Sequence, residues 1–351
     1  MLLSAIAGHL AFAVLLALMS AGAVRAMIAW PILDHPNHRS AHQVPTPRGG
    51  GLGPVLAFML GMLVLYGVAD AARLAERQFI GVLLAAVAIA GVALVDDVRY
   101  LSARLRLAAQ LLAALVAIGS GLVLTRIALP WIGAVELGWL GVPITLFWIL
   151  GCTNAVNFMD GLDGLVGGTV LIASAALCLI AAQQGGGFVY AAALFLAAGF
   201  LGFLPFNLHP ARIFMGDVGS QFAGFMLAVL AIAASRFDVN QVSFLIVPLL
   251  LFGLLFDAAF TLARRALAGQ RLSEAHRTHL YQMAQRSGVT VRAVAAAHWG
   301  FAVFHAALGM LFLALPASLK PLVVVPALAV QAAWLAFVLR RMRRAGLSWS
   351  A

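Results

Sequence analysis

Five aspartates in three separate segments carry the clearest chemical signal in this sequence: Asp96, Asp97, Asp160, Asp163 and Asp217. Each lies beside a long apolar run, at the expected end of a membrane-spanning helix, where an ionised group is expensive and usually functional. Five carboxylates on one face would repel each other and need a counter-charge. A divalent cation is the simplest one, and oxygen-only ligands favour Mg²⁺ or Mn²⁺, which share their remaining positions with phosphate.

The pair Asp96-Asp97 ends an apolar run and is followed by three arginines. One carboxylate of an adjacent pair can serve as a base near neutral pH, and the pair can also bind a metal. A solvated helix end explains the same pattern equally well. The pair therefore indicates a functional site only in combination with the other two acidic segments.

The run NAVNFMDGLDGL at 154–165 places a polar residue at every third position: Asn154, Asn157, Asp160 and Asp163. Neighbouring members share a helix face, but four of them drift around a straight helix, so a break at the glycines is needed. Asn, Asp and Gly are also the usual turn residues. A plain turn between two apolar spans would need far fewer polar groups, which favours a functional segment.

The run FMGDVGS at 214–220 places Asp217 between two glycines, immediately before another apolar run. Glycines let the backbone approach a ligand closely, and a helix N-terminus favours phosphate. An ordinary helix cap is the alternative. Beside the other two acidic segments, this run predicts a third arm of a metal or phosphate site.

Two longer basic loops remain. In the run EAHRTHLYQ, His276 and His279 flank Arg277. Histidine with arginine fits phosphate better than a metal pair, whereas contact with anionic lipid explains only the arginines. The loop 34–51 contains His38, Arg39, His42 and the run PTPRGGG. Its Arg48 and glycines suit a phosphate cradle or, equally, a rigid turn between helices.

The composition requires a membrane. Of the 351 residues 64% are hydrophobic and 10% are charged, and the mean hydropathy is +1.03, whereas soluble domains carry about 25% charged residues. The net charge of +10 is therefore interpreted as topological, and no nucleic-acid partner is expected. Residues 1–351 are expected to form a single polytopic membrane domain, with the first apolar run retained as a helix rather than cleaved as a signal peptide.

A membrane-spanning helix needs about 20 apolar residues. The sequence predicts an all-α integral membrane protein with about eleven transmembrane helices, at 3–30, 51–69, 79–95, 105–124, 139–155, 165–184, 188–206, 219–235, 242–263, 294–314 and 321–339. Asp257, inside the ninth span, is expected to be a structural partner of Arg264 or Arg265.

The distribution of basic residues predicts the orientation. Seventeen of the 22 Lys and Arg residues fall on the side of the loops 25–50, 96–106, 207–218, 264–292 and 340–351. Basic residues stay on the cytoplasmic side. The N-terminus is therefore expected in the periplasm, the C-terminus in the cytoplasm, and the five aspartates on the cytoplasmic face.

In chain order these motifs are PTPRGGG, Asp96-Asp97, NAVNFMDGLDGL, FMGDVGS and the histidine loop, and they cover nearly the whole chain. Together they resemble the motifs of the polyprenyl-phosphate N-acetylhexosamine-1-phosphate transferases, glycosyltransferase family 4. That family includes enzymes that initiate O-antigen synthesis and the phospho-N-acetylmuramoyl-pentapeptide transferase of peptidoglycan synthesis. The strongest parts of the resemblance are the NAVN-to-GLDGL run and MGDVGS.

The resemblance implies a multi-pass enzyme of the bacterial inner membrane that transfers sugar 1-phosphate from a UDP-N-acetylhexosamine to undecaprenyl phosphate, releasing UMP. It implies Mg²⁺, or Mn²⁺, as cofactor, membrane lipid as a partner and, as in many members, a homodimer. The metal would be bound by Asn157 and Asp217, and one of Asp96 and Asp97 would deprotonate the lipid phosphate. Asp160 and Asp163 are implied as nucleotide-sugar or further catalytic positions, and His276 and His279 as the catalytic histidine loop. Because donor and acceptor are both phosphates, Arg48, Arg212 and Arg277 are expected to bind substrate together with Asn154.

The last loop departs from the family pattern. Members often carry clustered histidines there, whereas Arg277 and Thr278 separate the two histidines of this chain. This is more similar to the O-antigen branch that takes 6-deoxy-N-acetylhexosamines such as FucNAc or QuiNAc than to the peptidoglycan enzyme with its large peptide substrate.

Two other function classes fit less well. A transporter of nucleotide sugars or lipid-linked sugars would place ionisable groups near the midplane on paired repeats, but here the acids lie at one face and no repeat is apparent. The phosphotransferases that use CDP-alcohols carry an Asp-Gly…Ala-Arg…Gly…Asp…Asp run that is absent from this sequence.

Overall fold

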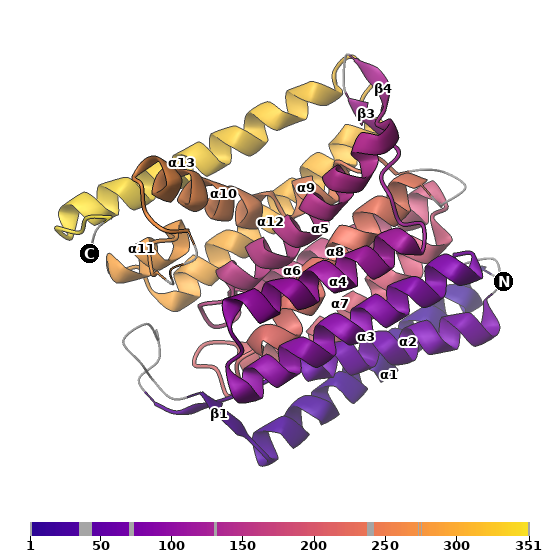
Figure 1. Ribbon diagram of the computed structural model, residues 1–351, viewed down its shortest axis with the longest axis horizontal. Coiled ribbons are helices and arrows are strands. Elements are labelled where there is room, and N and C mark those ends of the chain that lie inside the picture. Colours follow the sequence, from indigo (N-terminus) through magenta and orange to yellow (C-terminus); the bar gives the residue numbers. More distant parts are fainter. Residues whose placement is uncertain are drawn as a thin grey trace.

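The computed structural model describes residues 2–34, 44–69, 74–129, 132–236, 242–272, 274 and 276–349, and shows an almost wholly helical bundle (Figure 1). Its helices are α1 (Leu2–Ala29), α2 (Leu52–Val68), α3 (Glu76–Arg99), α4 (Ala103–Gly119), α5 (Gly141–Met159), α6 (Leu165–Gln184), α7 (Gly187–Asn207), α8 (Gly216–Arg236), α9 (Ile246–Leu250), α10 (Phe252–Leu267), α11 (Leu280–Arg286), α12 (Val291–Ala314) and α13 (Val324–Arg344). Its strands are β1 (Ile32–Asp34), β2 (Thr46–Arg48), β3 (Arg126–Leu129) and β4 (Gly133–Glu136).

Eight helical segments in the described ranges are long and apolar enough to cross a membrane; they contain α1, α3, α5, α6, α7, α8, α12 and α13. The predicted all-α membrane protein is thus confirmed. The other three expected spans coincide with α2 and α4, of 17 residues each, and with α9 and α10, which Leu251 separates. The number of eleven crossings therefore stays a prediction.

Helix α8 forms the centre of the bundle. Every residue from Val218 to Ala234 is buried, and the helix packs against α3 and α5. Its sequence is rich in alanine and glycine. Such small residues let neighbouring helices approach each other closely inside a membrane. This central position fixes Asp217, in the first turn of α8, relative to the ends of α3 and α5.

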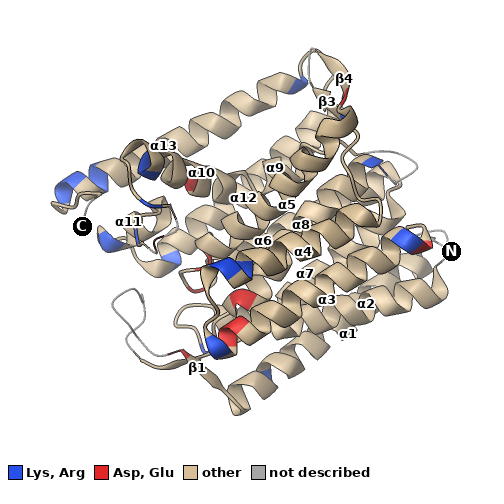
Figure 2. Ribbon diagram, in the orientation of Figure 1, with Lys and Arg blue, Asp and Glu red and all other residues tan. Residues whose placement is uncertain are grey.

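The two termini lie at opposite ends of the bundle (Figure 1). Most acidic residues lie at the end that also carries β1, α11 and the C-terminus (Figure 2); this is called the polar end below. The antiparallel hairpin of β1 and β2, in register Ile32↔Arg48, lies there. Which side of a membrane this end faces stays a prediction, and His38, Arg39 and His42 lie outside the described residues.

Candidate active site

A pocket of about 570 Å³ opens at the polar end of the bundle. It contains seven of the twelve site residues expected from the sequence: Arg48, Asp97, Asn157, Asp160, Asp163, Asp217 and Arg277. They come from β2, from the ends of α3, α5 and α8, and from the segment before α11. The three acidic segments and both basic loops therefore converge on one site.

Asp97 holds α8 in place. Its Oδ1 and Oδ2 accept hydrogen bonds from the backbone amides of Asp217 and Val218, each at 3.0 Å. A carboxylate at a helix N-terminus is stabilised by the free amides and by the helix dipole. Gly216 has a φ of +75° and lies so close that a Cβ there would be 2.5 Å from the Asp97 carboxylate. The glycine before Asp217 thus serves the turn and this close approach.

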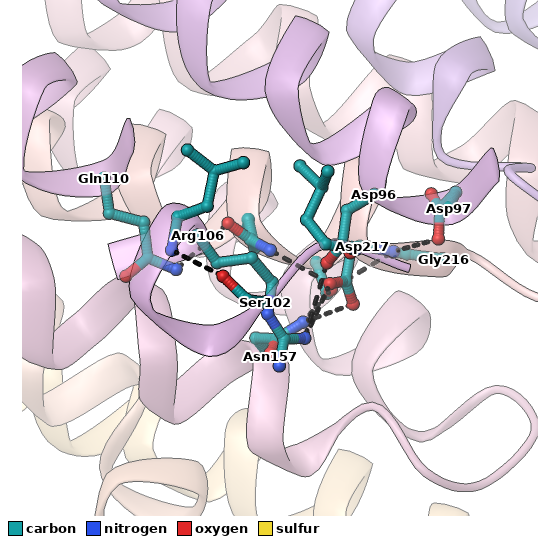
Figure 3. Close-up of polar contacts among 12 residues, drawn as sticks. Asp96, Asp97, Ser102, Arg106, Gln110, Asn157, Gly216 and Asp217 are labelled. Atoms are coloured by element: carbon teal, nitrogen blue, oxygen red, sulfur yellow. Dashed lines mark hydrogen bonds and ion pairs between the residues drawn. The ribbon is translucent and has the colours of Figure 1, made fainter. Parts of the chain in front are cut away.

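Asp217 lies between an amide and a guanidinium, as Figure 3 shows. Asn157 Nδ2 donates to Asp217 Oδ1 at 2.9 Å, and Arg106 Nη1 lies 3.5 Å from Asp217 Oδ2. Gln221 Nε2 donates to the same Oδ2 at 3.1 Å. The expected neighbours Asn157 and Asp217 are therefore in direct contact.

Asp96 does not line the pocket. Its Oδ1 accepts the Leu101 amide at 2.5 Å, and its Oδ2 lies 3.4 Å from Arg106 Nη1, which also contacts Asp217. Asp96 thus holds Arg106 against Asp217 and ties the start of α4 to the end of α3. The two adjacent carboxylates have separate environments.

Asp160 is the carboxylate with the fewest partners in this pocket. It forms no side-chain hydrogen bond or ion pair within the described part of the chain, and it follows the last residue of α5. Burial and the negative charges of Asp217, Asp97 and Asp163 raise the pKa of Asp160 well above its usual range. An acid of this kind gains most from a cation.

Asp163 joins two loops. Its Oδ2 lies 2.6 Å from Nδ1 of His209 and accepts the Ala211 amide at 3.1 Å. Nearby, Asn207 Oδ1 accepts the Gly164 amide at 3.0 Å. The segment after α5 is thereby fixed to the segment between α7 and α8, and both line the pocket.

The glycines of the run PTPRGGG contact protein backbone. The amides of Gly50 and Gly51 donate to the carbonyls of Phe214 and Met215, at 2.9 and 2.8 Å, and a Cβ on Gly51 would collide with Gly219. Of the two alternatives for these glycines, a phosphate cradle or a rigid turn, the observed contacts fit the turn, which packs against the loop before α8. Arg48 lines the pocket, donates to the Asp97 carbonyl and stacks on Tyr100 with 4.4 Å between the guanidinium carbon and the ring centroid.

Five expected residues do not line the pocket. Arg212 is exposed and stacks on Phe206, 5.5 Å from the ring centroid, and Asn154 donates to Gln110 Oε1 and to the Leu150 carbonyl, both at 2.8 Å. Besides these two, the residues outside the lining are Asp96, His276 and His279. Type and spacing predicted the correct segments, but the direction of each side chain depends on packing between helices.

The histidine loop lies beside the pocket. His276 and His279 stack with ring centroids 5.0 Å apart, and α11 begins only after them. Burial, together with the charges of His279, Arg265 and Arg264, lowers the pKa of His276 to about 4. His276 is therefore neutral at neutral pH, and its Nδ1 forms a hydrogen bond with the Thr278 hydroxyl at 3.1 Å. From this loop, Arg277 is the residue that reaches the pocket with a charge.

Three polar residues of this network escaped the sequence analysis: Arg106, Gln110 and Gln221. Gln110 Nε2 donates to Gln221 Oε1 at 3.0 Å, which connects Asn154 to Asp217 through two buried amides. A signal existed, because a glutamine one helical turn after an arginine, inside an apolar span, is expensive unless it is paired.

Comparison with known proteins bears directly on this site. The model of glycosyl transferase family 4 matches residues 79–235, which include the five aspartates but neither Arg48 nor the histidine loop. A probable undecaprenyl-phosphate N-acetylglucosaminyl 1-phosphate transferase of Bacillus subtilis (strain 168) is 33% identical over 262 residues, 74% of this chain and 71% of the relative. The chain belongs to glycosyltransferase family 4.

Two other family 4 relatives differ in their substrates by name. A decaprenyl-phosphate N-acetylglucosaminephosphotransferase of Mycobacterium tuberculosis is 32% identical over 288 residues, 74% of this chain and 70% of the relative. A phospho-N-acetylmuramoyl-pentapeptide-transferase of Lacticaseibacillus paracasei is 47% identical over 107 residues, 30% of this chain and 33% of the relative. The peptidoglycan relative thus matches over a shorter stretch than the other two.

Proposed function

We propose that this protein transfers an N-acetylhexosamine 1-phosphate from a UDP-sugar to undecaprenyl phosphate, or a related polyprenyl phosphate, at the cytoplasmic face of a bacterial inner membrane. UMP leaves and a polyprenyl-diphosphate sugar forms, as the initiating step of a surface polysaccharide such as O-antigen. The observation that carries this proposal is the convergence of Asp97, Asp160, Asp163 and Asp217 with Arg48 and Arg277 on one pocket at the end of a membrane bundle.

The pocket suits Mg²⁺. Asp160 and Asp217 offer carboxylate oxygens, and Asn157 beside them offers an amide oxygen. No group of three or more His, Cys, Asp or Glu side chains that could hold a metal ion is found among the described residues. Mg²⁺ commonly binds one or two protein carboxylates and shares its other positions with water and phosphate oxygens. When bound, it would supply positive charge to the diphosphate.

The residues of the chain account for the rest of the chemistry. Arg48 and Arg277 bind and orient phosphate and neutralise its negative charge. Neither arginine forms or breaks a covalent bond. An oxygen of the lipid phosphate attacks the β-phosphorus of the donor, and the bond from that phosphorus to the bridging oxygen breaks, so this oxygen leaves with UMP. Asp97, fixed by α8 at the pocket wall, accepts the proton of the attacking phosphate.

The test is UMP release by purified protein in detergent or nanodiscs with undecaprenyl phosphate and Mg²⁺. The donors are UDP-GlcNAc, the sugar in the names of two relatives, and the 6-deoxy sugars UDP-FucNAc and UDP-QuiNAc. We expect UMP only with lipid and metal, its loss with EDTA, and a lipid product heavier by one sugar phosphate. Folded protein that yields no UMP with any donor would contradict the proposal.

A further inference from the structure

A buried carboxylate outside the pocket has four hydrogen-bond partners. Asp257 on α10 is 1% exposed. Its Oδ1 accepts the Leu280 amide and its Oδ2 the Tyr281 amide, both at 2.9 Å. Oδ1 also lies 3.1 Å from His279 Nδ1 and accepts the Thr261 hydroxyl at 3.2 Å. The expected pairing with Arg264 or Arg265 is thus wrong, since Arg265 instead donates to the carbonyl of Arg271.

These contacts fix the first turn of α11. Asp257 accepts the Leu280 and Tyr281 amides there and holds the His279 ring, whose Nδ1 faces the carboxylate. An ionised acceptor at a helix N-terminus is stronger than a neutral one. The segment 279–281 is therefore held to α10 by one side chain.

The same turn is docked against the acidic loop. The Tyr281 hydroxyl donates to the Phe158 carbonyl at 3.1 Å, and a Cβ on Gly161 would collide with that hydroxyl. Gly161 lines the pocket, and so do Arg277, Gln282 and Gln285 from either side of this turn. Any shift of the first turn of α11 would move this wall of the pocket.

We propose that Asp257 is a positioning residue for donor binding, which acts by holding α11 so that Arg277, Gln282 and Gln285 form one wall of the pocket. The inference rests on the proposed function for the identity of the donor. His279 then belongs to the same support, because it is buried against Asp257 and does not line the pocket. An asparagine at 257 offers one acceptor oxygen, so one backbone amide would face an NH₂ group and lose its acceptor.

The kinetic test compares Asp257→Asn with Thr261→Val, which removes the hydroxyl that donates to Asp257 but leaves both amides capped. In Asp257→Asn we expect the KM for the UDP-sugar to rise about tenfold or more, the effect of losing one charge-assisted hydrogen bond. The KM for the lipid phosphate and kcat should change little, and Thr261→Val should match wild type. A fall in kcat at unchanged donor KM would overturn the positioning role.

A second measurement does not depend on activity. Hydrogen exchange of peptides covering 276–286 should be faster in Asp257→Asn, with exchange of 218–234 in α8 unchanged. Unaltered exchange in 276–286 would overturn the inference, even if transferase activity is found. Conversely, a wild-type protein without UMP release would overturn the proposed function and leave this result valid.

If Asp257→Asn does not fold, Tyr281→Phe provides the same test from the opposite side. It removes the hydroxyl that docks α11 on the Phe158 carbonyl and keeps the ring. The same selective rise in donor KM is expected, and an unchanged donor KM would contradict the docking of this wall.

Discussion

Asp97 and Asp217 belong to one hydrogen-bonded network, but their carboxylates have different kinds of partner. Asp97 gives both carboxylate oxygens to backbone amides of α8, whereas the Asp217 oxygens contact side chains of α4, α5 and α8. Removing either charge leaves the shape of the side chain in place. Substitution at Asp97 therefore removes both the proposed proton acceptor and a cap of α8, whereas substitution at Asp217 removes a charge from the pocket.

Asp217→Asn and Asp97→Asn should each fold and lose activity by about 10²-fold or more, the size of effect seen when one electrostatic group is removed from a reacting centre. Asp97→Asn should also lower the melting temperature, because one α8 amide loses its acceptor. UMP release and thermal unfolding of the same preparations check this. Full turnover in both variants would refute the carboxylate assignment.

Asp160 offers a prediction with a sign in pH. Its folded-state pKa is raised above the ordinary value of about 3.9, so its protonated form stabilises the fold at low pH. This stability is lost as pH rises through the folded-state pKa. In EDTA, Asp160→Asn should therefore melt a few degrees above wild type, by a margin that grows as pH rises from about 4 towards the folded-state pKa and then levels off.

Thermal unfolding across that pH range checks the Asp160 prediction, and added Mg²⁺ should narrow the margin because a cation relieves the same repulsion. The variant should at the same time have little transferase activity. A variant that melts below wild type at high pH would show that the carboxylate has a stabilising partner.

Between elements, the segment after α13 is joined to the histidine loop. The Arg264 guanidinium lies over Trp349, 4.3 Å from the ring centroid, and its Nη2 donates to the Thr278 hydroxyl at 2.9 Å. Trp349 also contacts Phe260 of α10, at 6.2 Å between centroids. Arg264 is thereby held between α13's end and the loop that carries Arg277.

Trp349→Ala should lower turnover by about threefold to tenfold, because a partly buried cation–π contact contributes about 1 kcal/mol. Trp349→Phe keeps a ring and should retain most of the rate. Trp139, 80% exposed at the opposite end of the bundle, is the matched control. Equal losses in Trp349→Ala and Trp139→Ala would point to a general effect of tryptophan removal.

Element positions were predictable from the sequence where length and hydropathy decide them. The expected span at 165–184 coincides with α6, and the break between Asn157 and Gly164 lies where the glycines predicted it. The interruption at Leu251 lies between Pro248 and Gly253, which could have announced it, but the expected span runs through both. In the site, Arg106 and Arg212 are equivalent by type, and only packing places Arg106 on Asp217 and Arg212 on Phe206.

At the scale of the whole molecule, the positive-inside distribution predicts that the polar end faces the cytoplasm. Both native cysteines are buried, so single introduced cysteines report accessibility cleanly. Ile132→Cys, between β3 and β4, should react with a membrane-impermeant maleimide in intact spheroplasts. Ala345→Cys should react only in inverted vesicles. The reverse labelling pattern would show that the topology is opposite to the predicted one.

The contact between Asp97 and the first turn of α8 spans 120 residues of chain. In co-translational insertion, α3 enters the membrane long before α8 is synthesised. Until then, the carboxylate that will hold the centre of the bundle has none of its backbone donors and must stay hydrated at the membrane surface. A nascent chain halted between these helices would therefore carry an exposed acidic pair. Insertion of α8 supplies the backbone amides that bind Asp97 and thereby completes the site.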